Sequence, residues 1–145
     1  MSSELTVRMA SAVSAIDKAA WDACAGSANP FVCHDFLSIL EASGSVGPGT
    51  GWAASPITVE AGDGTILAAA PAYLKSHSQG EYVFDHGWAD AWERAGGAYY
   101  PKLQIAAPFS PVPGPRLLLR NGADASGLIA GIEAVVDQHG LSSAH

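Results

Sequence analysis

The chain has 145 residues, of which 48% are hydrophobic and 14% are charged, and its formal net charge is −7. This length fits one domain, and so apolar a composition excludes disorder of the whole chain. The negative charge argues against a DNA-binding surface, which needs a basic stripe. The N-terminus lacks the pattern of a signal peptide, and no apolar run approaches the roughly eighteen residues of a membrane span. We therefore expect a cytoplasmic protein without membrane insertion.

The first part of the chain predicts one strand followed by two helices. Residues 5–10 alternate apolar and polar side chains, the period of a half-buried strand. Ser14 and Asp17 form an S-x-x-D capping box for a helix that ends at Gly26. A second helix is expected over residues 29–44, where Asn-Pro provides the start and glycine the stop. The core-facing positions predicted for these helices are Val13, Ile16, Ala20, Cys24, Phe36, Ile39 and Leu40.

The remaining elements follow a glycine-rich run, residues 44–51, which favours a flexible or tightly turning connector over a phosphate-binding loop. They are a hairpin of residues 57–60 and 65–74, a strand over 80–86, a short helix over 88–94, a strand over 103–107, an extended segment over 108–115, a helix over 126–140 that carries Ile129, Ile132 and Val136, and the start of a strand over 141–145.

Most of the chemically distinctive side chains lie between Pro71 and Arg116. Eight of the twelve aromatic residues are found there, and five of the seven basic residues lie between Lys75 and Arg120. Aromatic rings among a few ionisable groups are typical of small-molecule and peptide sites. A basic patch in an acidic protein suits a small anionic ligand better than a polymer. The eight aromatic residues are Tyr73, Tyr82, Phe84, Trp88, Trp92, Tyr99, Tyr100 and Phe109.

Asp85 is the candidate catalytic group, as a general base or as an anchor for a substrate amine. The alternative is a carboxylate that only accepts hydrogen bonds from a neighbouring turn. On a strand, Glu81 and Asp85 would lie about 13 Å apart, farther than the two carboxylates of a glycosidase. The histidines and the two cysteines, Cys24 and Cys33, have no metal-ligand or redox spacing, which makes a metal-dependent hydrolase a distant third choice.

The candidate binding groups are basic and polar residues at the ends of apolar segments. Lys75 and Arg116 are the cations expected to bind an anionic ligand, with ordinary surface charge as the alternative. The other candidates for ligand contact, each of which also has a purely structural interpretation, are His77, Tyr100, Lys102 and Gln104.

Three segments resemble the FemAB-like family of GNAT-related proteins, described as peptidoglycan biosynthesis or recognition proteins. They are SGSVGPGTGW, APAYLKSHSQGEYVFDHGWADAWERAGGAYYPKLQ and PFSPVPGPRLL, and the resemblance covers most of residues 21–145. It implies an α/β (α+β) fold of GNAT type, with a mixed, largely antiparallel sheet flanked by helices, which this chain does not complete. Residues 1–145 would then be the N-terminal half-domain of a longer tandem protein, a fragment whose C-terminal half is a partner.

The resemblance further implies a transferase that acylates an amine of a small anionic or peptide-like acceptor. Lys75 and Arg116 would bind phosphate or carboxylate, Asp85 would orient or deprotonate the amine, and Tyr100 or Gln104 would line the pocket. Acyl-CoA or aminoacyl-tRNA would be the co-substrate of the full protein. The alternative is a non-catalytic recognition module for a peptide or cell-wall precursor.

We expect no cofactor in this half of the protein. A GNAT donor loop holds the coenzyme A pyrophosphate with consecutive backbone N–H groups. Within SPVPGPR, Pro111, Pro113 and Pro115 each lack that donor. The sequence therefore predicts that acetyl-CoA does not bind to this chain.

Overall fold

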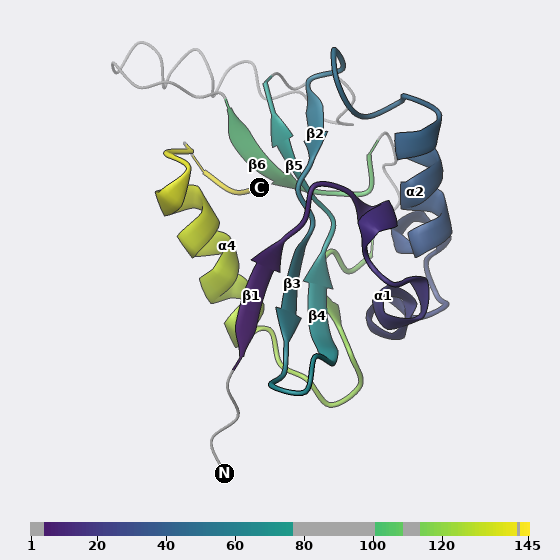
Figure 1. Cartoon of the computed structure of the whole chain (residues 1–145), viewed down its shortest axis with the longest axis vertical. Helices are drawn as coiled ribbons and strands as arrows, with labels where there is room; N and C mark the ends of the chain where they lie inside the picture. The colour runs from purple at the N-terminus through teal and green to yellow at the C-terminus, as the bar shows by residue number, and fades with distance from the viewer. Residues whose placement is uncertain (1–4, 77–100, 109–113, 142) are drawn as a thin grey trace.

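The structure is a computed structural model that describes residues 5–76, 101–108, 114–141 and 143–145 (Figure 1). Antiparallel strands flanked by helices make up these residues, which confirms the predicted α/β class. The elements, in chain order, are β1 (Thr6–Met9), the 3-10 turn η1 (Val13–Ala15), α1 (Lys18–Ala25), the 3-10 turn η2 (Pro30–Val32), α2 (His34–Ala42), β2 (Trp52–Ala54), β3 (Ile57–Glu60), β4 (Ile66–Ala70), β5 (Ala72–Lys75), β6 (Lys102–Ile105), β7 (Leu118–Leu119) and α4 (Ser126–Gln138).

The strands form a four-stranded sheet, in the order β1-β3-β4-β7, and a three-stranded sheet, in the order β2-β5-β6. One long hairpin belongs to both sheets, because only Ser55 and Pro56 separate β2 from β3 and only Pro71 separates β4 from β5. Proline has no backbone N–H, so each strand loses a ladder bond where it passes between the sheets. The Ser55 N–H still donates to Ala72 O at 2.8 Å, which holds the two arms of the hairpin together at the crossing.

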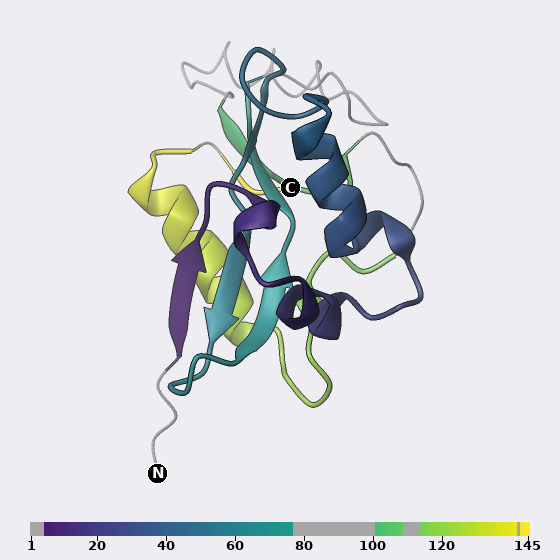
Figure 2. The ribbon, with the colours of Figure 1, turned by 45° about the vertical axis from the view of Figure 1, so that its right-hand side comes forward.

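Helix α4 covers one side of the sheets, and α1 and α2 cover the other (Figures 1 and 2). Leu128 and Val135 of α4 are buried in a core cluster with Ile57 and Val59 of β3. On the opposite side Trp21 of α1 is fully buried, and it belongs to a second cluster with residues of α2, β4 and β7. The sheets are therefore the middle layer of three.

Both helices of the first part begin later than the sequence predicts. Asp17 is itself the N-cap of α1 and accepts a hydrogen bond from Ala20 N–H at 2.9 Å, while Ser14 lies in the preceding 3-10 turn. Asn29 caps only the turn η2, and α2 begins at His34. In both cases a 3-10 turn occupies the residues where the sequence predicts the first turn of the helix. The capping residues alone do not indicate such a turn.

Two residues that the sequence predicts to face the core, one in α2 and one in α4, are exposed instead. Ile39 is 62% exposed and Ile129 is 46% exposed, whereas Leu37 and Leu128 are completely buried. In both helices the buried stripe is centred one or two positions earlier than expected. A strand at β7 and the short strand β2 were also not predicted.

The last residues pair with the three-stranded sheet, as the predicted strand start over 141–145 required. The Leu103 N–H donates to Ser143 O at 3.0 Å, and the His145 N–H donates to Leu103 O at 2.9 Å. The bridge between Leu103 and Ala144 is parallel. The chain therefore returns to β6 after α4 and lies on its outer side.

The close approach of α4 to β1 supplies a stability prediction. A Cβ atom added at Gly131 would lie 2.7 Å from Val7 Cγ1, whereas one at Gly127 would lie 3.4 Å from Leu5 Cδ1. We expect Gly131→Ala to lower the free energy of unfolding by about 1–2 kcal/mol, because overpacking outweighs the gain in helix propensity. The matched variant Gly127→Ala should be neutral or slightly stabilising. Urea denaturation of both variants tests this, and a Gly131→Ala protein as stable as wild type would contradict it.

Candidate functional site

One face of the three-stranded sheet gathers aromatic, basic and amide side chains. Lys75 of β5 lies directly opposite Trp52 of β2 and Lys102 of β6, and Tyr73 lies opposite Ala54 and Gln104. Directly opposed residues of antiparallel strands have their side chains on the same face. We call this set, Trp52, Tyr73, Lys75, Lys102 and Gln104, the polar face.

The opposite face of these strands is apolar. Leu74, Leu103 and Ile105 pack into the core cluster that α4 covers. The alternation along β5 and β6 therefore separates a core side from a site side, as the period of a strand requires.

Lys75 is the most unusual residue of the polar face because its side chain is fully buried. Its Nζ lies 3.7 Å from the centroid of the Trp52 ring, and Trp52 packs edge-on against Tyr73 with ring centroids 5.2 Å apart. A cation over an aromatic face is stabilised by roughly 0.5–2 kcal/mol, which offsets part of the cost of removing the charge from water. Lys102, opposite Lys75, is only 1% exposed. Lysine is almost never buried to this depth unless it is paired.

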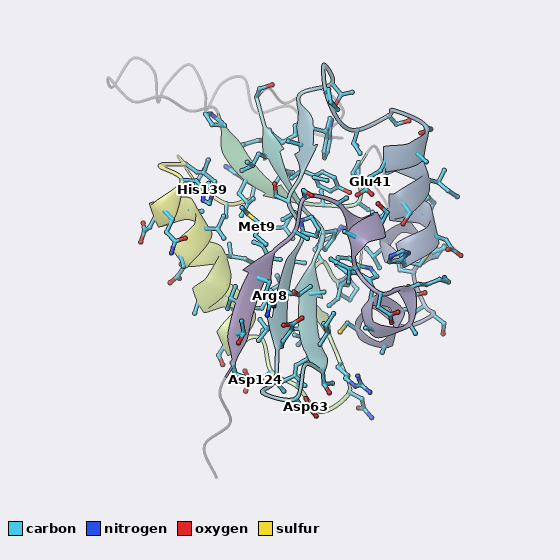
Figure 3. The ribbon with its side chains drawn as sticks, viewed as in Figure 1. Arg8, Met9, Glu41, Asp63, Asp124 and His139 are labelled. Carbon is cyan, nitrogen blue, oxygen red and sulfur yellow. The ribbon has the colours of Figure 1, made fainter. Side chains whose placement is uncertain are left out.

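A pocket of about 1180 Å³ opens beside this arrangement. It lies between the end of α2, the turn η1, the connector of residues 44–51 and strand β2. Its walls are mainly alanine, glycine, serine and proline, and Glu41 and Lys75 are its charged residues in the described part of the chain. Figure 3 shows Glu41 on the α2 side of the sheet. The pocket thus combines one carboxylate, one ammonium and small side chains.

The connector of residues 44–51 forms one wall of the pocket, and its backbone makes the tight turn that the sequence predicts. Gly47 and Gly49 have φ angles of 125° and 84°, which other residues rarely adopt. The turn folds back so that the Gly47 N–H donates to Trp52 O at 2.7 Å. It is thereby fixed to the edge of β2.

Glu41 connects α2 to the turn η1 and also acts on Tyr73. Its carboxylate accepts hydrogen bonds from Val13 N–H at 2.6 Å and from Ser14 N–H at 3.1 Å. Burial raises the pKa of the Tyr73 hydroxyl well above its usual range, and the Glu41 carboxylate raises it further. The Tyr73 hydroxyl therefore stays protonated at neutral pH. Tyr73 Oη and Gln104 Oε1 are buried without a hydrogen-bond partner among the described residues.

The comparison with protein families matches residues 12–145 to the FemAB-like family, which is described as peptidoglycan biosynthesis/recognition. The chain belongs to the FemAB-like family. Neither the comparison with curated proteins nor the comparison with solved structures gave a match. The matched range begins in the wall of the pocket and includes every strand of the polar face.

The FemAB-like chain brings together three of the residues that the sequence singled out. Lys75, Lys102 and Gln104 share the polar face. Arg116 lies apart from them: it lines a second cavity of about 390 Å³ with Ile105 and residues of α4, and its Nη1 donates to Gly114 O at 3.1 Å. The predicted residues Asp85, His77 and Tyr100 lie outside the described residues.

The sequence did not identify Trp52 or Glu41 as site residues of this FemAB-like protein, and it placed Tyr73 among the aromatic residues of the site-bearing stretch without giving it a role of its own. Tyr73 had a local signal, because it lies two positions before Lys75 on the same face of a strand. Trp52 had a weaker one, as an aromatic residue directly after a glycine run. Glu41 had none, since it contacts the turn η1 only through the tertiary fold.

The described part of the FemAB-like chain holds no group of three or more histidine, cysteine, aspartate or glutamate residues that could bind a metal ion. His34 has a structural role: its Nε2 is 2.7 Å from Ile16 O, and its Nδ1 is 3.2 Å from Ser38 Oγ.

Among the residues that the structure describes, no helix has the length and apolar character needed to cross a membrane.

Proposed function

We propose that this chain is the acceptor-binding, N-terminal GNAT-like half of a FemAB-like acyl or aminoacyl transferase. The observation that carries the proposal is the pocket of about 1180 Å³ whose floor includes Trp52 and the buried Lys75. A peptide-like acceptor agrees with the description of the family. The pocket, at about 1180 Å³, is slightly larger than the roughly 300–1,000 Å³ usual for sites that enclose a small ligand.

The proposed roles follow from the chemistry of each side chain. Lys75 attracts a carboxylate or phosphate of the acceptor. Lys102 and Gln104, beside it on the polar face, provide a second cation and an amide oxygen that accepts a hydrogen bond from an N–H or O–H group of the acceptor. Asp85 orients or deprotonates the amine, and Tyr100 and His77 contact the acceptor. Arg116 lies at the second cavity and is outside the proposed acceptor pocket. The activated acyl group comes from acyl-CoA or aminoacyl-tRNA bound by the C-terminal half, in the cytoplasm.

Binding of a muramyl peptide tests the proposal. Isothermal titration with a synthetic muramyl peptide that carries a free side-chain amine should give a saturable signal with this chain. Acetyl-CoA under the same conditions should give none, because proline interrupts the backbone donors of the SPVPGPR segment. Absence of muramyl peptide binding, or micromolar binding of acetyl-CoA, would overturn the assignment.

The family description also covers recognition without catalysis, which is the second candidate. The two differ in what the full protein does with a bound acceptor. Mass spectrometry of the muramyl peptide after incubation with the full protein and an acyl donor separates them. An added acyl or aminoacyl mass supports the transferase, and an unchanged mass supports the recognition module.

A further inference from the structure

Strand β2 has one edge paired with β5 and one edge that faces the pocket. The Ser76 N–H donates to Gly51 O at 3.2 Å, and the Ser55 N–H donates to Ala72 O at 2.8 Å. Backbone groups alternate in direction along an antiparallel strand. Residues 51, 53 and 55 therefore bond to β5, and the N–H and C=O groups of Trp52 and Ala54 point away from it.

The outward groups on either side of Ala54 are already used. Trp52 O accepts the Gly47 N–H at 2.7 Å, and Trp52 N–H donates to Thr50 Oγ1 at 3.0 Å. Two residues beyond Ala54, Pro56 O accepts the Ala10 N–H at 2.9 Å. Within the described part of the chain, the N–H and C=O of Ala54 have no hydrogen-bond partner. On this edge of the strand, Ala54 therefore has backbone groups available for hydrogen bonding, whereas those of Trp52 and the C=O of Pro56 are already bonded.

The pocket provides space beside this open position. Ala53 and Ala54 are among its lining residues, and the facing wall contains Ala12, Ala42 and Gly47, which have little or no side chain. From Trp52 to Pro56 the strand extends about 13 Å at 3.3 Å per residue. This length accommodates two or three residues of a second extended chain, which would lie about 4.8 Å from β2.

We propose that the acceptor binds as an extended peptide that pairs with β2 at Ala54. A peptide C=O accepts the Ala54 N–H, and a peptide N–H donates to Ala54 C=O, so that the ligand adds a short strand to the edge of the sheet. This inference rests on the proposed function and specifies its ligand: a short peptide with small side chains.

The charges of the pocket match such a peptide if it carries an amine and a carboxylate. Each Glu41 oxygen accepts one backbone N–H and keeps a second lone pair, which suits an ammonium group. Lys75 is the cation among the described lining residues and suits the carboxylate. The amine would then lie toward α2 and the carboxylate toward β5.

The test removes the outward N–H without disturbing the ladder with β5. Proline is tolerated on an edge strand where its nitrogen faces away from the neighbouring strand. Ala54→Pro should therefore weaken binding of the muramyl peptide at least tenfold in isothermal titration, and Ala54→Ser, which keeps the N–H, should bind at least threefold more tightly than Ala54→Pro. Thermal denaturation of both variants verifies the fold.

A second measurement uses the unmodified protein, in case Ala54→Pro does not fold. In a series of muramyl peptides, each with one backbone nitrogen methylated, one analogue should lose at least tenfold in affinity while its neighbours bind normally. If the wild-type chain binds the peptide but no methylated position and no Ala54 variant matters, pairing at Ala54 is wrong and the proposed function stands. If the unmodified peptide does not bind, both are wrong.

Discussion

Replacing Lys75 with methionine is expected to weaken binding of the muramyl peptide more than tenfold. Methionine retains most of the length of the unbranched side chain but removes the ammonium group that lies over the Trp52 ring. A hydrogen bond to a charged group contributes about 1.5–3 kcal/mol, and each 1.4 kcal/mol corresponds to a factor of ten in the dissociation constant. Because Lys75 is fully buried, little water screens its charge from the ligand. Isothermal titration of the variant and of wild type measures the change.

The matched control is Lys18→Met. The Lys18 side chain is 54% exposed, forms ion pairs with Asp22 and Asp35, and is absent from the lining of the pocket. Its replacement should leave the affinity for the muramyl peptide within twofold of wild type. Equal affinities for Lys75→Met and wild type would remove Lys75 from the acceptor site.

Trp52→Ala should lower the free energy of unfolding by about 3–5 kcal/mol, the usual cost of truncating a fully buried tryptophan. The Trp52 side chain is 2% exposed and contacts both the Tyr73 ring and the Lys75 ammonium. Its loss leaves a cavity and also removes the aromatic face that stabilises the buried cation. Equilibrium urea denaturation followed by circular dichroism gives the difference.

Trp52→Phe separates the two contributions. Phenylalanine keeps an aromatic face for Lys75 but fills less volume, so we expect a loss of only about 1–2 kcal/mol. If alanine and phenylalanine destabilise the protein equally, the contact between the ring and Lys75 is not stabilising. A loss below about 1 kcal/mol for Trp52→Ala would show that the polar face tolerates a cavity.

Most strands and helices could be predicted because their signals are local. The hairpin turn at Ala61–Gly64 and the glycine at the end of α1 depend on neighbouring residues only. The alternation over residues 5–10 predicted the strand β1 but not its burial, because all four residues of β1 are exposed. The starts of α1 and α2 could not be predicted, because each follows a 3-10 turn that packs against distant parts of the chain. The two-residue strand β7 depends entirely on pairing with β4 and has no period of its own.

Some residues of the candidate site could also be predicted from local signals, whereas others required the tertiary fold. Lys102 and Gln104 could be assigned to one face because they alternate with the apolar Leu103 and Ile105 on a strand. That Lys75 lies directly opposite Lys102 depends on strand register, which the intervening residues do not specify. The contribution of Glu41 required the packing of α2 against η1, and the open edge at Ala54 required the positions of both neighbouring segments.

The hairpin shared by the two sheets restricts how this protein can acquire new ligands. One end of this hairpin carries Tyr73 and Lys75, and the other end carries core residues that pack against α4. A substitution that shifts the strands near the pocket therefore also shifts residues of the core. The turn of residues 47–50 is less coupled to the interior, because Pro48 and Gly49 are exposed, whereas Val46 before it is buried in a cluster with Trp52 and Tyr73. Divergence in ligand preference among related proteins should therefore concentrate in that turn, while the strands beneath it stay nearly invariant.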